Sequence, residues 1–130
     1  MTNAPLVMPG YVADMVVLPL RKLGLDPLHG EDLITCPLRY EDGTELSIAI
    51  WCVAQRGWFR QKAMVAVTLM ELAGDMRVVR VYLRDVLPCP TRPNDMSFFI
   101  RVSALVRAMA WAHATTGNMG ECTDLPRQSM

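Results

Sequence analysis

Hydrophobic and polar residues alternate through residues 34–50, on both sides of a turn sequence at residues 41–43. Alternation of this kind is typical of a strand with one buried face, and the pairing register decides which side chains share that face. A turn of three residues gives the pairs Arg39 with Glu45, Leu38 with Leu46, Cys36 with Ile48 and Ile34 with Ile50. The apolar pairs then lie together, whereas a turn of two residues would scatter them over both faces. The pattern therefore predicts a β-hairpin that turns at Glu41, Asp42 and Gly43.

A second hairpin is predicted over residues 65–83, with its turn at Ala73, Gly74 and Asp75. The same pairing rule matches Leu72 with Met76, Glu71 with Arg77, Leu69 with Val79, Val67 with Val81 and Val65 with Leu83. The opposite face would then carry Met64, Thr68, Met70, Arg80, Tyr82 and Arg84. A helix over residues 60–72 is the alternative, but the β-branched residues and the matched partner strand favour a strand.

A helix is predicted from Met96 to Thr116, because residues 93–95 supply a start signal and Gly117 supplies a stop. Its inward face is formed by Phe98, Val102, Leu105, Val106, Met109 and Ala112, with Phe99 beside them. The opposite side carries Ile100, Arg107 and Trp111. An exposed tryptophan near an isoleucine indicates a surface that has a partner.

Residues 10–24 are predicted to form an amphipathic helix that ends at Gly24, with Pro19 as a point where it could divide into two pieces. Together these elements predict an α+β fold, an antiparallel sheet of two consecutive β-hairpins flanked by an N-terminal and a C-terminal helix. We place this single domain at residues 1–117. Residues 118–130 lack periodicity and are expected to form a loosely ordered tail.

The composition favours a protein partner over a nucleic acid. The 130 residues include 13 basic and 13 acidic side chains, so the net charge is zero, and 52% of the residues are hydrophobic. Nucleic-acid-binding domains usually carry a clear positive charge, whereas surplus apolar side chains indicate surface that another protein covers. We therefore expect a protein partner rather than a nucleic acid.

The hydropathy of the chain also bears on its location. No apolar run approaches the roughly 18 residues that a membrane span requires. The N-terminal residues lack the basic start and the apolar core of a secretory signal. We expect no membrane contact and a cytoplasmic location.

Catalytic chemistry is sparse in this sequence. The four cysteines are widely spaced, and neither histidine has a neighbour at metal-ligand spacing. Cys36 and Cys52 lie in apolar runs, where a buried packing role is expected. No glycine-rich phosphate loop or cofactor fingerprint occurs. We therefore predict no catalytic residue, no metal and no cofactor, and rank a thiol-dependent enzyme below the binding functions.

Two groups of side chains are candidate partner-binding sites. The first lies around the connection between the hairpins and on the outer face of the sheet, and comprises Trp51, Trp58, Phe59, Met64 and Tyr82. The second is the helix stripe of Ile100, Arg107 and Trp111. Trp51 and Trp58 could equally close the core, because aromatic residues dominate both cores and interfaces.

Several segments carry a family resemblance. They are residues 23–25, residues 38–48, residues 67–69, residues 77–79 and residues 87–88, followed by a helix with Phe98, Leu105 and Trp111. Their order and hydrophobic patterning resemble the class I type III secretion chaperone family, with residues 38–48 similar to its first hairpin. The resemblance implies a non-enzymatic, cytoplasmic homodimer that keeps a segment of a secreted effector protein unfolded along apolar grooves and a sheet edge. The alternative hypothesis is a phage or bacterial inhibitor or immunity protein that blocks an enzyme or a defence complex by direct binding.

Overall fold

The computed structural model describes residues 4–30, 32–39, 45–56, 60–75 and 77–115. Within these residues the chain forms six strands and two helices. In chain order they are β1 (Ala4–Leu6), α1 (Gly10–Lys22), β2 (Leu28–His29), β3 (Ile34–Arg39), β4 (Glu45–Arg56), β5 (Gln61–Leu72), β6 (Val78–Pro88) and α2 (Met96–Thr115).

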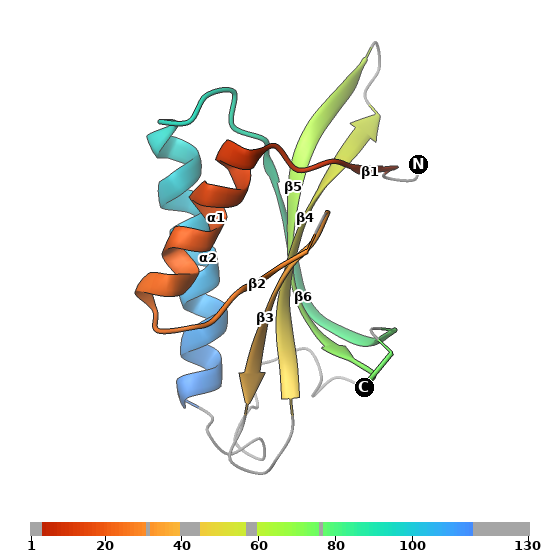
Figure 1. The fold of residues 1–130 in the computed structure, drawn as a ribbon, viewed down its shortest axis with the longest axis vertical. Helices are drawn as coiled ribbons and strands as arrows, with labels where there is room; N and C mark the ends of the chain where they lie inside the picture. The colour runs from red at the N-terminus through yellow and green to blue at the C-terminus, as the bar shows by residue number, and fades with distance from the viewer. Residues whose placement is uncertain (1–3, 31, 40–44, 57–59, 76, 116–130) are drawn as a thin grey trace.

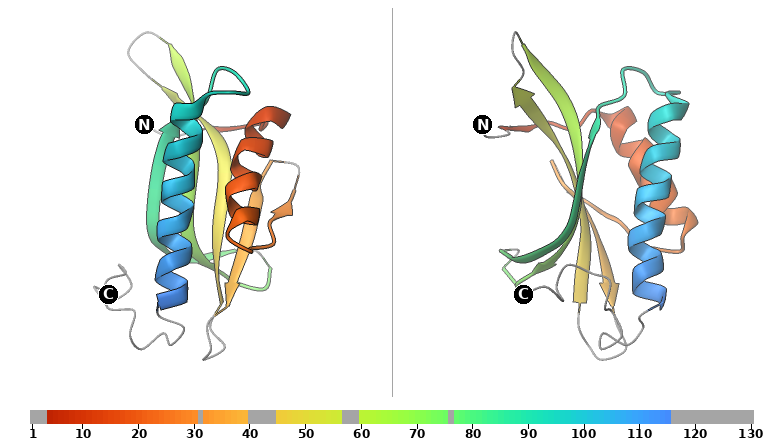
Figure 2. Two further views of the ribbon diagram at one scale, coloured as in Figure 1. Left: turned by 90° about the vertical axis from the view of Figure 1, so that its left-hand side faces the viewer. Right: turned by 180° about the vertical axis from the view of Figure 1, so that it is seen from behind.

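The strands form one antiparallel sheet with the order β2-β3-β4-β5-β6 (Figure 1). Strand β1 also pairs with β4, where Leu6 lies opposite Cys52, beyond the pairing of Ile50 with Ile34, the first residue of β3. The two helices lie side by side on one face of the sheet and run in the same direction (Figure 2). The predicted α+β class, with consecutive hairpins and a helix at each end, is confirmed, and the short strands β1 and β2 are additions to it.

The hairpin of β3 and β4 has the predicted register. Ile34 pairs with Ile50, and the pairing continues in step to Arg39 and Glu45. The side chains of that last pair approach to 3.8 Å, between Nε of the arginine and Oε2 of the glutamate. The predicted turn at residues 41–43 lies outside the described residues.

Strand β4 is longer than the sequence pattern predicts. It continues past Ile50 to Arg56 and pairs with β5 over residues 47–56. Trp51 therefore lies within a central strand pair rather than beside a connection between two hairpins. Strand β4 ends at Arg56, and β5 begins at Gln61.

The hairpin of β5 and β6 forms where it is predicted, but its predicted register is wrong. Leu69 pairs with Leu83 rather than with Val79. Two irregularities near the turn end of the hairpin add residues to β6, and each extra residue shifts the alternation of the strand. Val79 and Val81, expected on the buried face, are consequently 51% and 46% exposed.

The structure shows whether residues 61–72 are a strand or a helix, and whether Pro19 divides the first helix. Residues 61–72 form a strand, so the helical alternative is wrong. Helix α1 continues through Pro19 without dividing. Pro19 is buried, and we attribute its tolerance to packing that offsets the hydrogen bond its ring removes. The chain leaves the helix at Gly24, whose φ of 80° is a conformation that glycine adopts readily.

The hydrophobic core lies between the helices and the inner face of the sheet. Completely buried side chains come from both helices and from the three strands β3, β4 and β5: they include Val12, Val16, Leu20, Ile34, Ile48, Ile50, Val67, Leu69, Val102 and Val106. Burial of this apolar surface is the main favourable contribution to folding, at about 25 cal/mol per Å². The sheet and helices are thereby fixed relative to one another, which positions the surfaces described below.

Helix α2 is packed as predicted. Phe98, Val102, Val106 and Met109 are buried, while Leu105 is half-buried. The Asp95 carboxylate accepts a hydrogen bond from the N–H of Phe98 at 3.2 Å and so caps the first turn. The side chains of residues 111–115, Ala112 and Trp111 included, lie outside the described part.

Candidate functional site

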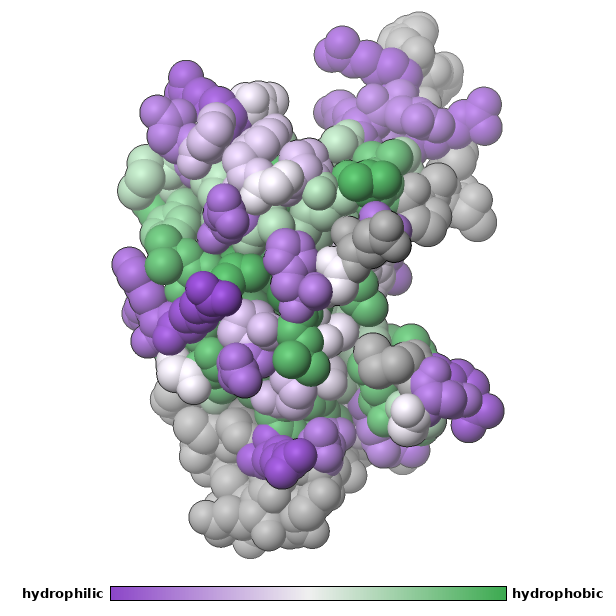
Figure 3. All heavy atoms as spheres, in the orientation of Figure 1, coloured by the Kyte–Doolittle hydropathy of each residue, from purple (hydrophilic) through white to green (hydrophobic). Residues whose placement is uncertain are grey.

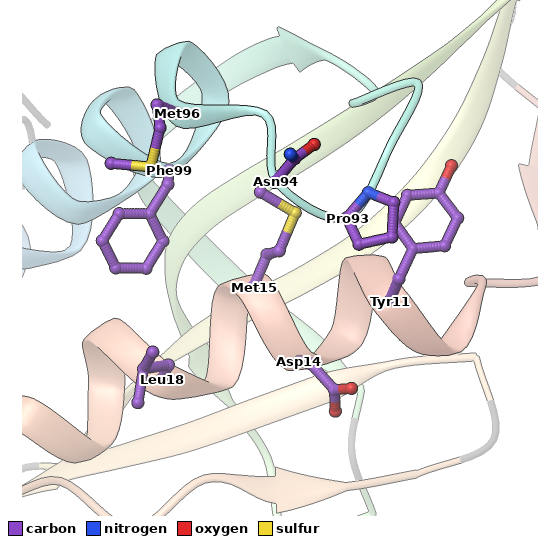
Figure 4. A pocket seen from close by; sticks show the side chains of 8 residues that line it. All are labelled: Tyr11, Asp14, Met15, Leu18, Pro93, Asn94, Met96 and Phe99. Atoms are coloured by element: carbon purple, nitrogen blue, oxygen red, sulfur yellow. The ribbon is translucent and has the colours of Figure 1, made fainter.

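A groove runs between the outward faces of α1 and α2. Its wider part has a volume of about 370 Å³ and is lined by Tyr11, Asp14, Met15, Leu18, Pro93, Asn94, Met96 and Phe99 (Figure 4). Tyr11 lies beside Pro93, and its hydroxyl donates a hydrogen bond to the Pro90 carbonyl at 2.9 Å. This bond ties the start of α1 to the segment before α2 and fixes the wall of the groove.

The groove continues toward the C-terminal halves of the helices. A second hollow of about 200 Å³ is lined by Pro19, Lys22, Leu23, Phe99, Ser103 and Arg107. Phe99 lines both parts, so the two hollows form one groove, which we call the helix groove. The Lys22 ammonium lies 5.7 Å from the centre of the Phe99 ring, within the range of a cation–π interaction.

Large apolar side chains stand exposed in and near the helix groove. Leu18 and Met96, which line it, are 46% and 61% exposed, and Ile100, one helical turn after Met96, is 60% exposed. Apolar surface is also visible between charged side chains over the helices in Figure 3. The charges are separated along the groove, since Asp14 lies in the wider part and Lys22 and Arg107 lie in the narrower part. An apolar centre with opposite charges at its two ends is a surface suited to a protein partner.

The free edge of the sheet is strand β6. It is the last strand in the sheet order, and no described segment pairs with its outer side. Val78, Val79 and Val81 are exposed along it. Such an edge presents unpaired backbone N–H and C=O groups that can receive a further strand.

The outer face of the sheet, opposite the helices, is hollowed (Figure 3). Trp51 is half-buried on this face, and the Arg84 guanidinium carbon lies 5.8 Å from the centre of its ring. Tyr82 is only 3% exposed, and its hydroxyl donates a hydrogen bond to Glu71 Oε1 at 3.2 Å. The prediction that Tyr82 is exposed on the outer face is therefore wrong. Tyr82 is an extra residue in the irregular pairing of β6 with β5, and its side chain packs in the hydrophobic core.

The remaining predicted site residues fall in different places. Met64 is half-buried and lines a hollow near the start of β5. Trp58 and Phe59 lie outside the described residues. Ile100 and Arg107 are exposed on α2, as predicted for the helix stripe. Trp51 alternates on β4 with the core residues Ile50 and Cys52, so its side chain is on the face of the sheet away from the helices, whereas Ile100 is on α2. The two predicted groups therefore belong to separate surfaces.

Three cysteines, Cys36, Cys52 and Cys89, lie in the described part of the chain and pack in or against the hydrophobic core. Cys36 and Cys52 are buried, as predicted for packing residues, and Cys89 is half-buried. Burial raises the pKa of the Cys52 thiol to about 12, with the neighbouring Cys89 adding to the effect. Burial also raises the pKa of Cys36 and of Cys89, although a hydrogen bond with Cys52 lowers the pKa of Cys89. These thiols stay protonated near neutral pH and are poor nucleophiles.

Across the described part of the chain, no three His, Cys, Asp or Glu side chains are grouped closely enough to hold a metal ion. Neither α1 nor α2 is long and apolar enough over its described residues to cross a bilayer.

Sequence reasoning missed most of the residues that line the helix groove and the exposed edge of β6. Met96 precedes Ile100 by one helical turn, so helical spacing alone could have added it to the predicted stripe. Leu18 gave no such signal, because its partner surface comes from a different helix. The exposed valines of β6 were concealed by the irregular register.

No protein-family model, curated protein or solved structure matches this chain. The functional conclusion therefore depends on the two surfaces themselves.

Proposed function

We propose that this protein is a non-enzymatic binding domain that holds an extended segment of a partner polypeptide along the edge of β6, in the manner of a secretion chaperone. The observation that carries the proposal is the unpaired edge of β6 with its exposed valines. An added strand would gain backbone hydrogen bonds along this edge and apolar contacts with alternate side chains.

The charges along this edge favour an acidic segment. Residues 77–88 contain three arginines, Arg77, Arg80 and Arg84, and one aspartate, Asp85. Within the described residues, the one ion pair joins Arg39 and Glu45. Glu71 lies opposite Arg80 in the register, but its carboxylate accepts a hydrogen bond from Tyr82 and forms no ion pair with that arginine. A second copy of β6 would bring like charges opposite each other, which disfavours pairing of two such edges. An extended partner with alternating apolar and acidic residues fits the edge better.

One part of the edge is already occupied. The N–H of Val86 donates a hydrogen bond to the Asp85 carboxylate at 2.9 Å. We therefore place the bound segment beside residues 78–84, where the valines and two of the arginines lie.

The cysteine chemistry supports a role without catalysis. The pKa values of Cys36, Cys52 and Cys89 are all raised by burial, which disfavours the thiolate that a thiol-dependent enzyme requires.

The test uses a synthetic fluorescein-labelled peptide of about nine residues with alternating valine and glutamate. Fluorescence anisotropy should show saturable binding to the whole protein. A peptide with alternating valine and lysine should bind roughly tenfold more weakly, because it meets the arginines with like charge. A valine–glutamate peptide with N-methyl groups on alternate amides keeps the side chains but loses edge hydrogen bonds, and should not bind.

The position of the site is tested by Val79→Pro. Val79 falls at the irregularity and has no partner on β5, so the substitution removes an edge N–H without breaking a registered pair. Binding of the valine–glutamate peptide should weaken about tenfold, whereas the control Val79→Thr should stay within about threefold. Equal binding by Val79→Pro and wild type, or by the N-methylated and unmodified peptides, would show that β6 is not the binding edge.

A further inference from the structure

Both helices lie on one face of the sheet (Figure 2), so the helix groove that they line is on the opposite side from the outer sheet face. It has no part in the function proposed for β6. Its lining is mostly apolar and includes the exposed side chains of Leu18 and Met96, and Ile100 is exposed one helical turn after Met96. In a monomer these side chains would face water together. Exposed apolar side chains that lie together indicate a surface that a partner covers.

The charges of α1 are arranged symmetrically about Leu18. Asp14 precedes it by four residues and Lys22 follows it by four residues, so the three side chains share one face of the helix. Neither Asp14 nor Lys22 forms an ion pair with another described residue. The stripe thus reads acidic, apolar and basic in order along the helix.

A stripe with this order is complementary to its own copy turned end for end. With a two-fold axis near Leu18, Asp14 of one protomer meets Lys22 of the other, and the reverse contact follows from symmetry. The two copies of Leu18 then face each other at the centre, with Met96 and Ile100 of α2 extending the apolar contact. Homodimers commonly use a self-complementary patch of this kind.

We propose that the helix groove is a homodimer interface in which α1 helices of two protomers pack antiparallel about Leu18. Self-complementarity of charge selects a second copy as the occupant, because an unrelated partner would have no reason to match the symmetry about Leu18. The interface leaves β6 free on each protomer, so the dimer presents two binding edges.

The test is sedimentation velocity on the whole protein over a concentration series. The dimer of the wild-type protein should have a dissociation constant of about 100 µM or lower. Asp14→Lys alone and Lys22→Asp alone should each raise the dimer dissociation constant roughly tenfold, because each variant sets like charges against each other twice. An equimolar mixture of the two variants should form a mixed dimer, since both contacts then join opposite charges.

An apolar substitution gives a second measurement. Leu18→Glu should abolish the dimer, whereas the control Leu28→Glu, at an exposed leucine on β2, should leave it intact. Circular dichroism would establish that both variants are folded.

The proposal fails if wild type is monomeric throughout the series, if the mixture of Asp14→Lys and Lys22→Asp stays monomeric while wild type dimerises, or if Leu18→Glu dimerises like wild type. Peptide binding at β6, measured on Leu18→Glu, is independent of these outcomes, so a failure of the dimer is distinguishable from a failure of the proposed function.

Discussion

The two edges of the sheet are built differently. On one side, β2 pairs with β3 at Thr35 and Ile34, and Pro37 follows without a backbone N–H to offer. On the other side, β6 is the outermost strand, with three exposed valines and irregular pairing to β5. Proteins commonly block edge strands with short strands and prolines, because open edges attract other chains. The sheet is therefore closed by a two-residue strand and a proline at the β2 end, whereas β6 is the more open of its two edges.

The largest expected effect separates the two edges by stability. Ile34→Ala on β3 removes a completely buried side chain and should lower the free energy of unfolding by about 3 kcal/mol. Val79→Ala on β6 removes an exposed side chain and should lower it by less than about 0.5 kcal/mol. Urea denaturation followed by circular dichroism measures both, and similar losses would contradict the distinction between the edges.

The next largest effect is a dependence of stability on pH, which arises from the buried thiol of Cys52. Burial raises the pKa of Cys52 from 9.0 to about 12, so the unfolded chain loses the proton first as the pH rises. The stabilising contribution is complete below about pH 9 and declines as the pH rises toward about 12.

Wild type should accordingly lose on the order of 2 kcal/mol more stability than Cys52→Ala between about pH 9 and about pH 11. Urea titrations of both proteins at each pH give this difference, and Val79→Ala serves as a control whose pH dependence should match wild type. Parallel pH profiles for wild type and Cys52→Ala would show that burial of this thiol does not control the alkaline response.

The smallest expected effect on stability comes from replacing Pro37, which lacks a backbone N–H on β3. Pro37→Thr supplies a backbone N–H and a side chain suited to a strand, and should change the free energy of unfolding by less than about 0.5 kcal/mol. If proline blocks β3, the variant should bind a second, weaker equivalent of the valine–glutamate peptide in an anisotropy titration. A stoichiometry equal to that of wild type would place the block elsewhere, for example in the pairing of β2 with β3.

Part of this architecture follows from local sequence patterns. The register from Ile34 to Glu45 was predictable because a turn of fixed length and a strict alternation leave one pairing with a single apolar face. Asp95 likewise marks the start of α2, since its carboxylate satisfies a backbone N–H in the first turn. These features depend on residues close together in the chain or on a regular period.

The irregular hairpin shows where local patterns stop. The pairing of Leu69 with Leu83 depends on extra residues in β6, and the alternation of hydrophobic and polar residues does not indicate them. The same shift exposes Val79 and buries Tyr82, which changes the candidate binding edge. The strands β1 and β2, with three and two residues, are too short to show a period.

The sequence by itself determined the α+β class, the first hairpin, the strand at residues 61–72 and the outward position of Ile100. Periodicity and turn chemistry are sufficient for these, because they act over a few residues. Tertiary structure alone decided that α1 lies against α2 and so forms the helix groove around Phe99, and that β6 is left as the free edge. Both depend on which distant segments pack together, and packing is settled by the burial of the whole apolar surface rather than by any one segment.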